Sequence, residues 1–182
     1  VYLYYGNASA VNAETRWPIH LSFGDGADGD ITVSANTNIN TTNKISGRSC
    51  ADGGDAVNYN ITAFGGSTVT TATLSSTPSS GCLSAGDEVL LINLQGTSSY
   101  YTNVGNYEIM VIDSTSTNTI TFTTLKTKYY GNGTSDDTNI GTSTSNQRVM
   151  LQRIPNYNDV TVSSGYNFYP SAWSGTKGGV RS

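Results

Sequence analysis

Apolar and polar residues alternate in short stretches along the chain, and turn-forming residues separate those stretches. The most regular stretch covers residues 57–64, where every second residue is apolar: Val57, Tyr59, Ile61 and Ala63. Successive side chains of a β-strand point to opposite faces, so this pattern predicts a strand with one buried face. The helix formers Ala, Leu, Glu and Lys never cluster over a helix-length stretch, and we therefore expect no helices.

Eight further segments have the β-branched and aromatic character of strands. They cover residues 1–5, 31–33, 68–74, 88–94, 107–113, 119–123, 149–154 and 159–162. Residues 107–113 and 119–123 flank a turn and form the clearest predicted hairpin. About nine strands at this spacing predict an all-β fold, as an antiparallel sandwich, jelly roll or barrel with long loops rich in Asn, Ser and Gly. No repeat of fixed length stands out, which disfavours a regular solenoid.

The first strand segment is apolar or aromatic at every position: Val1, Tyr2, Leu3, Tyr4 and Tyr5. A strand with one wet face would alternate, so both faces of this segment need burial. An irregular stretch follows, and we divide the chain into an N-terminal strand with an extended arm (residues 1–23) and a β domain (residues 24–182). The strand could add to a sheet edge of a second copy and build a homopolymer, or it could pair within its own domain.

Composition narrows the class of protein. Charged residues make up 12% of the chain, against about 25% in typical soluble domains. The net charge is −4 and no basic patch is visible, so we expect no nucleic-acid partner. No apolar run approaches the roughly 20 residues of a membrane span.

Two cysteines, Cys50 and Cys82, lie in Gly/Ser-rich stretches. A disulfide between them is the favoured prediction and would fit a secreted protein, and two separate buried thiols are the alternative. Four sequons make Asn7, Asn40, Asn60 and Asn132 candidate glycosylation sites.

Asp25, Asp28 and Asp30 lie in a Gly-rich loop. Calcium prefers several oxygen ligands on a bendable backbone, so a structural calcium ion is a candidate here, against a solvated turn. The loop lacks the twelve-residue pattern of an EF-hand. No other cofactor is expected.

Catalytic patterns are weak. His20 is the only histidine, and no nucleophile-elbow motif surrounds it. Glu88 and Glu108 begin predicted strands and could form a carboxylate pair of the kind that glycosidases use. Ordinary strand-edge carboxylates are the simpler interpretation, and we predict that the protein is not an enzyme.

Tyrosine is the abundant aromatic residue, with twelve copies. Aromatic rings can form platforms for sugars, and they also suit protein interfaces and cores. The candidates for such a platform are Tyr100, Tyr101, Tyr129, Tyr130, Tyr157, Tyr166 and Tyr169. Surface glycans are therefore possible partners.

Several motifs resemble a family of bacterial surface proteins that includes large proteins connected with adventurous gliding motility in myxobacteria. They are Gly86-Asp87-Glu88-Val89-Leu90-Leu91-Ile92, Gln95-Gly96-Thr97, Tyr107-Glu108, Gln152-Arg153-Ile154-Pro155, Asn158-Asp159-Val160-Thr161-Val162 and the stretch from Ala172 to Val180. Separately, the segment from Val1 to Asn7 resembles the closing strand of a lectin-like domain. The resemblance implies secretion and display at the cell surface, and it supplies no catalytic residues.

These observations together predict a non-enzymatic extracellular structural protein, a subunit of a surface filament or pilus-like assembly built by strand addition. A carbohydrate-binding or adhesive surface module is the alternative, and a hydrolase is a third hypothesis. A filament subunit should polymerise, a sugar binder should expose an aromatic platform, and a hydrolase should have converging catalytic groups.

Overall fold

The computed structural model describes residues 24–65 and 70–180, which form ten β-strands and no α-helix. The all-β prediction is therefore confirmed. The strands are β1 (Gly29–Val33), β2 (Thr37–Asn38), β3 (Asn58–Phe64), β4 (Thr71–Leu74), β5 (Glu88–Gln95), β6 (Tyr107–Ser116), β7 (Thr119–Phe122), β8 (Arg148–Arg153), β9 (Tyr157–Val162) and β10 (Phe168–Tyr169).

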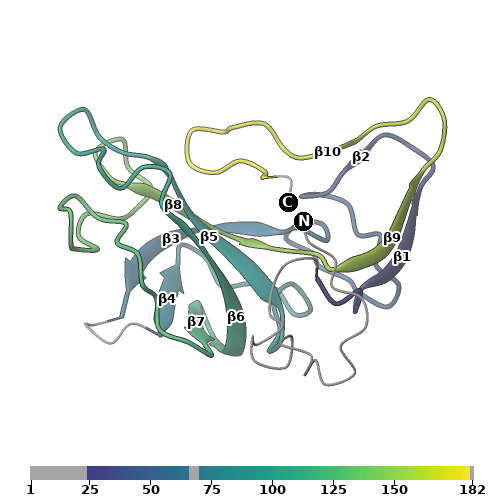
Figure 1. Cartoon of the computed structure of the whole chain (residues 1–182), viewed down its shortest axis with the longest axis horizontal. Helices are drawn as coiled ribbons and strands as arrows, with labels where there is room; N and C mark the ends of the chain where they lie inside the picture. Colours follow the sequence, from purple (N-terminus) through teal and green to yellow (C-terminus); the bar gives the residue numbers. More distant parts are fainter. Residues whose placement is uncertain (1–23, 66–69, 181–182) are drawn as a thin grey trace, which may run out of the picture.

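Six of the strands close into an antiparallel barrel in the order β3-β4-β7-β6-β5-β8, on the left in Figure 1. Closure pairs every strand on both sides, so the barrel has no free edge. The predicted hairpin is present as β6 and β7, which turn at Thr117 and Asn118. Of the alternatives that the sequence left open, the barrel is the observed architecture.

The barrel interior holds the alternating apolar residues of the strands. Tyr59 and Ile61 of β3 point into this core, as predicted, whereas Ala63 is exposed. The ladder between β3 and β4 shifts register between Ile61 and Ala63, and such an irregularity re-aims the following side chains.

Strand β8 is buried along its whole length because a second layer covers its outer face. Gln152 donates to the carbonyl of Val180 over 2.7 Å and accepts from its N–H over 3.0 Å. Asn58 of the neighbouring strand β3 donates to the carbonyl of Gly178 over 2.9 Å. The C-terminal stretch therefore lies against the outside of the barrel.

Outside the barrel, two small ladders are parallel, which differs from the antiparallel prediction. Strand β1 pairs with β9, and β2 pairs with β10. Figure 1 shows these four strands together on the right of the molecule. The chain passes through β1 and β2 before it forms the barrel, and through β9 and β10 after it. We call residues 29–38 the first coil and residues 157–169 the second coil.

The two coils repeat one sequence motif. Asp30-Ile31-Thr32-Val33-Ser34 in the first coil corresponds to Asp159-Val160-Thr161-Val162-Ser163 in the second. The ladder keeps this correspondence, since Ile31 pairs with Val160 and Val33 with Val162. Two stacked, parallel coils are therefore present beside the barrel, and the barrel-forming segment lies between them in the sequence.

Candidate functional site

The second coil presents an open strand edge. Strand β9 is exposed at every position after Tyr157. Within residues 24–65 and 70–180 it pairs with β1 alone, and β10 pairs with β2 alone. The far sides of β9 and β10 therefore offer backbone N–H and C=O groups for which this part of the chain supplies no strand. Such an edge is a template for a further strand.

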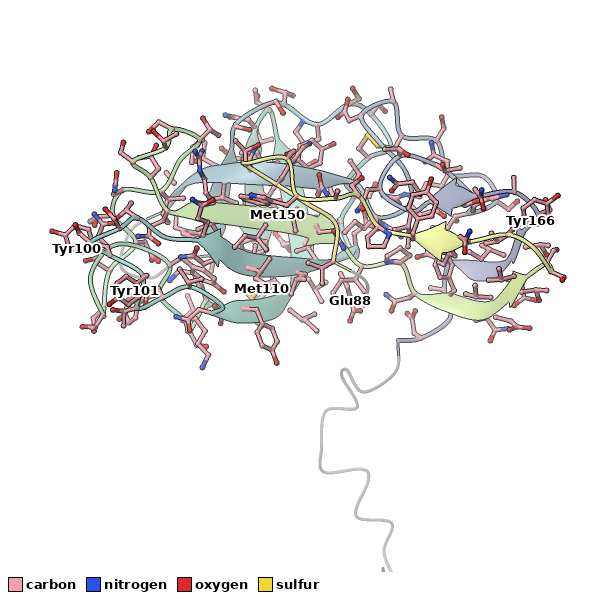
Figure 2. All side chains as sticks on the ribbon, turned by 90° about the horizontal axis from the view of Figure 1, so that it is seen from above. Glu88, Tyr100, Tyr101, Met110, Met150 and Tyr166 are labelled. Atoms are coloured by element: carbon pink, nitrogen blue, oxygen red, sulfur yellow. A yellow bond between two sulfur atoms is a disulfide. The ribbon has the colours of Figure 1, made fainter. Side chains whose placement is uncertain are left out.

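Apolar side chains accompany this edge. Val160 is 38% exposed and Val162 is 44% exposed, whereas their ladder partners Ile31 and Val33 are 4% and 0% exposed. Parallel neighbours in register point to the same face. The second coil thus continues the apolar face of the first coil. On the first coil this face is buried, and on the second coil it is half exposed. Tyr166, labelled in Figure 2 at this end of the molecule, is also exposed.

An asparagine pair joins the corners of the two coils. Asn36 immediately precedes β2, and Asn167 immediately precedes β10. The Asn36 side-chain oxygen accepts from the Asn167 backbone N–H over 3.0 Å and from its side-chain nitrogen over 3.2 Å. The Asn167 side-chain oxygen accepts no hydrogen bond from the residues that the structure describes. A third asparagine in the same position of another coil could therefore continue the row.

A buried ion-pair cluster attaches the coils to the barrel. Arg153, the last residue of β8, donates to the Asp28 carboxylate over 2.7 Å and, through Nε, to Asp87 over 2.8 Å. Arg48 also pairs with Asp87, over 3.2 Å. Asp28 directly precedes the first coil, so this cluster fixes the coil against the barrel.

The same cluster sets the ionisation of Asp28. Burial alone would raise the pKa of its carboxyl, but hydrogen bonds from Arg153 and from the Asn156 N–H outweigh it. The net effect holds the Asp28 pKa below its ordinary value of 3.8. Asp28 therefore stays ionised as a partner of a fixed guanidinium.

The acidic loop does not gather into a metal cage. While Asp28 binds Arg153, Asp25 accepts from the Ala27 N–H over 2.9 Å. Asp30 accepts from the Asn158 side chain over 2.7 Å. No group of three or more His, Cys, Asp or Glu side chains positioned for a metal ion occurs in the described residues. Calcium binding at Asp25, Asp28 and Asp30 stays a prediction.

The opposite end of the molecule carries exposed tyrosines. Tyr100 and Tyr101 lie in the loop between β5 and β6, with 49% and 69% exposure, and Figure 2 shows them far from Tyr166. Buried amides brace this loop, because Gln147 donates to the Tyr100 carbonyl over 2.9 Å and accepts from Asn93 over 3.0 Å. Two exposed rings on a braced backbone could stack on a sugar.

Not all predicted platform residues are available. Tyr130 is fully buried in the barrel core and donates to Glu108 over 3.1 Å. Tyr157 donates to the buried Asp55 carboxylate over 2.8 Å. Tyr129 and Tyr169 are exposed. Alternating patterns do not distinguish such inward tyrosines from exposed ones, because the ring suits both settings.

The disulfide between Cys50 and Cys82 is confirmed, with an S–S distance of 2.06 Å. It joins the β2–β3 connection to the β4–β5 connection. A link of this kind stabilises mainly by constraining the unfolded chain, more so for a longer closed loop.

The predicted glycosylation sites differ in accessibility. Asn40 is 5% exposed, and its side-chain nitrogen donates to the Ala56 carbonyl over 2.7 Å and to Gln152 over 3.1 Å. A glycan on that nitrogen would break both bonds, so Asn40 is corrected to a buried structural amide. Asn60 and Asn132 are half-buried, and their glycosylation stays a prediction. Asn7 lies outside the described residues, as do Val1, Tyr2, Leu3, Tyr4 and Tyr5.

The two candidate catalytic carboxylates are separately engaged. Glu88 accepts from the Asn156 side chain over 3.1 Å. Glu108 accepts from the Thr127 N–H over 2.7 Å as well as from Tyr130. Each carboxylate thus stabilises a loop. These contacts do not support the hypothesis that Glu88 and Glu108 form the carboxylate pair of a glycosidase.

The open edge was missed by sequence reasoning, although a signal was present. Residues 31–33 and 159–162 were both expected to be strands, but their common motif lies on either side of the barrel-forming segment. Comparing the two motifs directly would have indicated two strands of like sequence at either end of the barrel-forming segment.

No protein-family model and no curated protein sequence matches this chain. Among solved structures, the chain is similar to the Gp54 tailspike of Acinetobacter baumannii bacteriophage AP22, determined in complex with A. baumannii capsular saccharide. The sequence identity is 16% and the TM-score is 0.32. The similarity covers 79% of this chain and 24% of the tailspike chain, so this chain spans about a quarter of the tailspike's length. At this TM-score we draw no conclusion about fold or function from the similarity.

Proposed function

We propose that this protein is a non-enzymatic structural module of an extracellular assembly, and that it joins other protein chains by β-strand addition. One observation carries the proposal: the second coil ends in an open edge, with β9 exposed along nearly its whole length. Main-chain hydrogen bonds along such an edge give affinity, and the alternating side chains give register.

The composition of the edge supports this role. Proteins usually protect exposed edges with Lys, Pro or a bulge. Strand β9 contains neither Lys nor Pro, and its single charged residue is Asp159. Val160 and Val162 are instead half exposed. The ladder shifts register before Val160, so residues 160–162 are the regular part of this edge, and their half-exposed apolar side chains favour a partner strand over contact with water.

The disulfide and the uncharged polar composition support an extracellular location. Disulfides persist in oxidising compartments, and the Cys50–Cys82 bond joins two Gly/Ser-rich connections. No helix of the described residues is long and apolar enough to cross a membrane. A structural role at the cell surface agrees with both the bond and the composition.

The proposal is tested by incorporation into assemblies. The full chain is incubated alone and with the surface-protein fraction of the cells that produce it, and assemblies are followed by sedimentation and negative-stain microscopy. We expect the wild-type chain to enter large assemblies, and the Val160→Lys/Val162→Lys variant to remain outside them. Both side chains are half exposed, so the variant should keep its circular dichroism spectrum.

Val104→Lys is the matched control, since Val104 is 40% exposed in the loop between β5 and β6, away from the edge. This variant should assemble normally. Equal incorporation of the wild type and the edge variant would contradict the strand-addition function.

Carbohydrate binding is a second candidate, favoured by the exposed Tyr100 and Tyr101 on their braced loop. Stacking of rings on sugars should make the Tyr100→Ala/Tyr101→Ala variant bind surface glycans at least tenfold more weakly. Glycan binding that is equal in both proteins, measured by calorimetry, would reject this end as a sugar site.

A further inference from the structure

We propose that the open edge of β9 and β10 receives a parallel strand–bend–strand coil of a partner protein, stacked on the second coil as the second is stacked on the first. This inference rests on the strand-addition function proposed above and assigns the chemistry of the partner. The argument starts from the contact between the two coils already present in the chain.

That contact shows which strand β9 accepts. On one side, β9 pairs in parallel with β1, and the paired residues belong to the same Asp-Ile/Val-Thr-Val-Ser motif. The second ladder repeats the arrangement around the corner, where β10 pairs with β2 through Phe168 with Thr37 and Tyr169 with Asn38. A coil thus packs on a coil of like sequence, in register from Ile31 with Val160 to Val33 with Val162 and again along β2 and β10.

The free side of the second coil presents apolar side chains, as the first coil does toward the second. Val160 and Val162 lie above the buried Ile31 and Val33 but are themselves half exposed. β-Branched residues of an added strand would cover them and remove their apolar surface from water. The partner therefore needs Ile, Val or Thr at the two positions that face Val160 and Val162.

The asparagine pair adds a second requirement. Asn167 donates to Asn36 through its backbone and side-chain nitrogens, and its side-chain oxygen accepts no hydrogen bond from residues 24–65 and 70–180. Rows of stacked Asn side chains stabilise parallel in-register strands. The partner coil should carry Asn at the corner position, directly before its second strand.

The extent of the edge favours a coil over the N-terminal strand segment. The edge comprises β9, the corner at residues 163–167 and β10. Val1–Tyr5 could cover β9 but not the corner or β10. In a second copy both coils are already paired with each other, and residues 39–156 lie between them in the sequence. A strand–bend–strand segment from another protein matches the whole edge.

The first coil itself supplies the probe. A synthetic peptide that copies residues 27–40 carries the motif and the corner Asn36. We expect it to bind the full chain in a fluorescence anisotropy titration. It should also protect the β9 and β10 backbone amides from hydrogen exchange. The matched control is a peptide of the same composition in scrambled order, which should not bind.

Three changes should each weaken the complex at least tenfold. They are Val160→Lys/Val162→Lys in the protein, Asn167→Ala in the protein, and Asn36→Ala in the peptide. Val104→Lys should bind the peptide as the wild type does. Binding of the coil peptide that is insensitive to the edge variant would overturn the inference.

A second probe separates this inference from the proposed function. A peptide that copies residues 1–9 is titrated in parallel. If it binds at β9 while the coil peptide does not, strand addition stands and the coil inference fails. If the chain self-associates through the edge and binds neither peptide, the edge belongs to a second copy and the inference also fails. If neither peptide binds and no assembly forms, both proposals fail.

Discussion

Arg153 connects parts of the chain that are far apart in sequence. Its guanidinium binds Asp28 before the first coil and Asp87 before β5. Asp28 was a candidate calcium ligand in the sequence, because a Gly-rich acidic loop resembles a metal site. In the fold, Arg153 of β8 pairs with the same carboxylate.

Replacing Asp28 by Asn should destabilise the fold by about 2–3 kcal/mol, because it removes one partner of a buried ion pair. The loss of stability stays below the full cost of an unpaired buried charge, because Arg153 keeps its ion pair with Asp87. Urea denaturation measures the change in the free energy of unfolding. Asp25→Asn is the control and should change it by less than about 0.5 kcal/mol, as Asp25 is exposed. Equal effects would contradict the assigned ion pair.

The lowered pKa of Asp28 makes stability depend on pH in a definite direction. The unfolded chain binds the proton more readily, so the stabilisation is fully present above the ordinary value of 3.8 and is lost as the pH falls through the lower folded pKa. Stability measured from about pH 5 downward should fall less steeply for Asp28→Asn than for the wild type. Identical slopes would show that another carboxylate governs acid unfolding.

The disulfide should contribute about 3–4 kcal/mol, because it closes a loop of 32 positions in the unfolded chain. The Cys50→Ala/Cys82→Ala variant should fold with an unchanged spectrum but a lower free energy of unfolding by that amount. Chemical denaturation with and without reductant provides the measurement. An unaffected wild type under reducing conditions would show that the bond is dispensable.

At the level of elements, the strands of the barrel pair antiparallel and the strands of the two coils pair in parallel. The barrel strands pair antiparallel through hairpins and closure, so their alternation can be read locally. The coil strands pair in parallel with partners from the far end of the chain. Parallel neighbours need a crossover connection, and here that connection contains the barrel itself.

The segment Val1–Tyr5 remains the predicted donor for contacts between copies of the chain. Deleting it should abolish self-assembly while leaving a folded β domain, because large apolar side chains contribute roughly 1.5–3 kcal/mol each when buried in a neighbour. Electron microscopy and circular dichroism of the truncated chain test this. Binding of the coil peptide should be unchanged, because the truncation leaves the residues of β9 and β10 in place.

Two results would contradict the donor role. Filaments that persist without Val1–Tyr5 would remove the segment from the assembly contact. A truncated chain that fails to fold would indicate that the segment pairs within its own domain.

At the scale of the whole molecule, two exposed surfaces lie at opposite ends. The tyrosine loop and the coil edge are separated by the barrel, as the positions of Tyr100 and Tyr166 in Figure 2 show. Occupation of one end therefore leaves the other free. This arrangement suits a module that is held in an assembly by its coils while its barrel end faces outward.

Metal removal should leave the whole molecule intact. Asp28 already has a protein cation, and Asp25 and Asp30 accept from the chain itself. We expect the melting temperature in EDTA to stay within about 2 °C of its value with added calcium, a shift that corresponds to less than about 1 kcal/mol. A large loss in EDTA that calcium reverses would restore the acidic loop as a metal site.

The sequence by itself determined the all-β class, the main strands of the barrel, the β6–β7 hairpin and the disulfide. These features depend on local alternation, turn residues and the presence of only two cysteines. Residues such as Tyr130 and Asn40 show the limit of this reasoning, because tyrosine and asparagine occur equally at surfaces and in cores. Their burial depends on neighbours from distant strands.

Only the tertiary structure decided that the barrel closes, that residues 29–38 and 157–169 stack as two parallel coils, and that no other described strand pairs with the second coil. The pattern of side chains along a strand indicates which face is buried. It does not indicate which strand pairs at its edge, because edge pairing uses backbone groups that all residues share. The repeated motif could therefore predict two similar strands. It could not predict that folding brings them together, or that no strand of residues 24–65 and 70–180 pairs with the far side of β9.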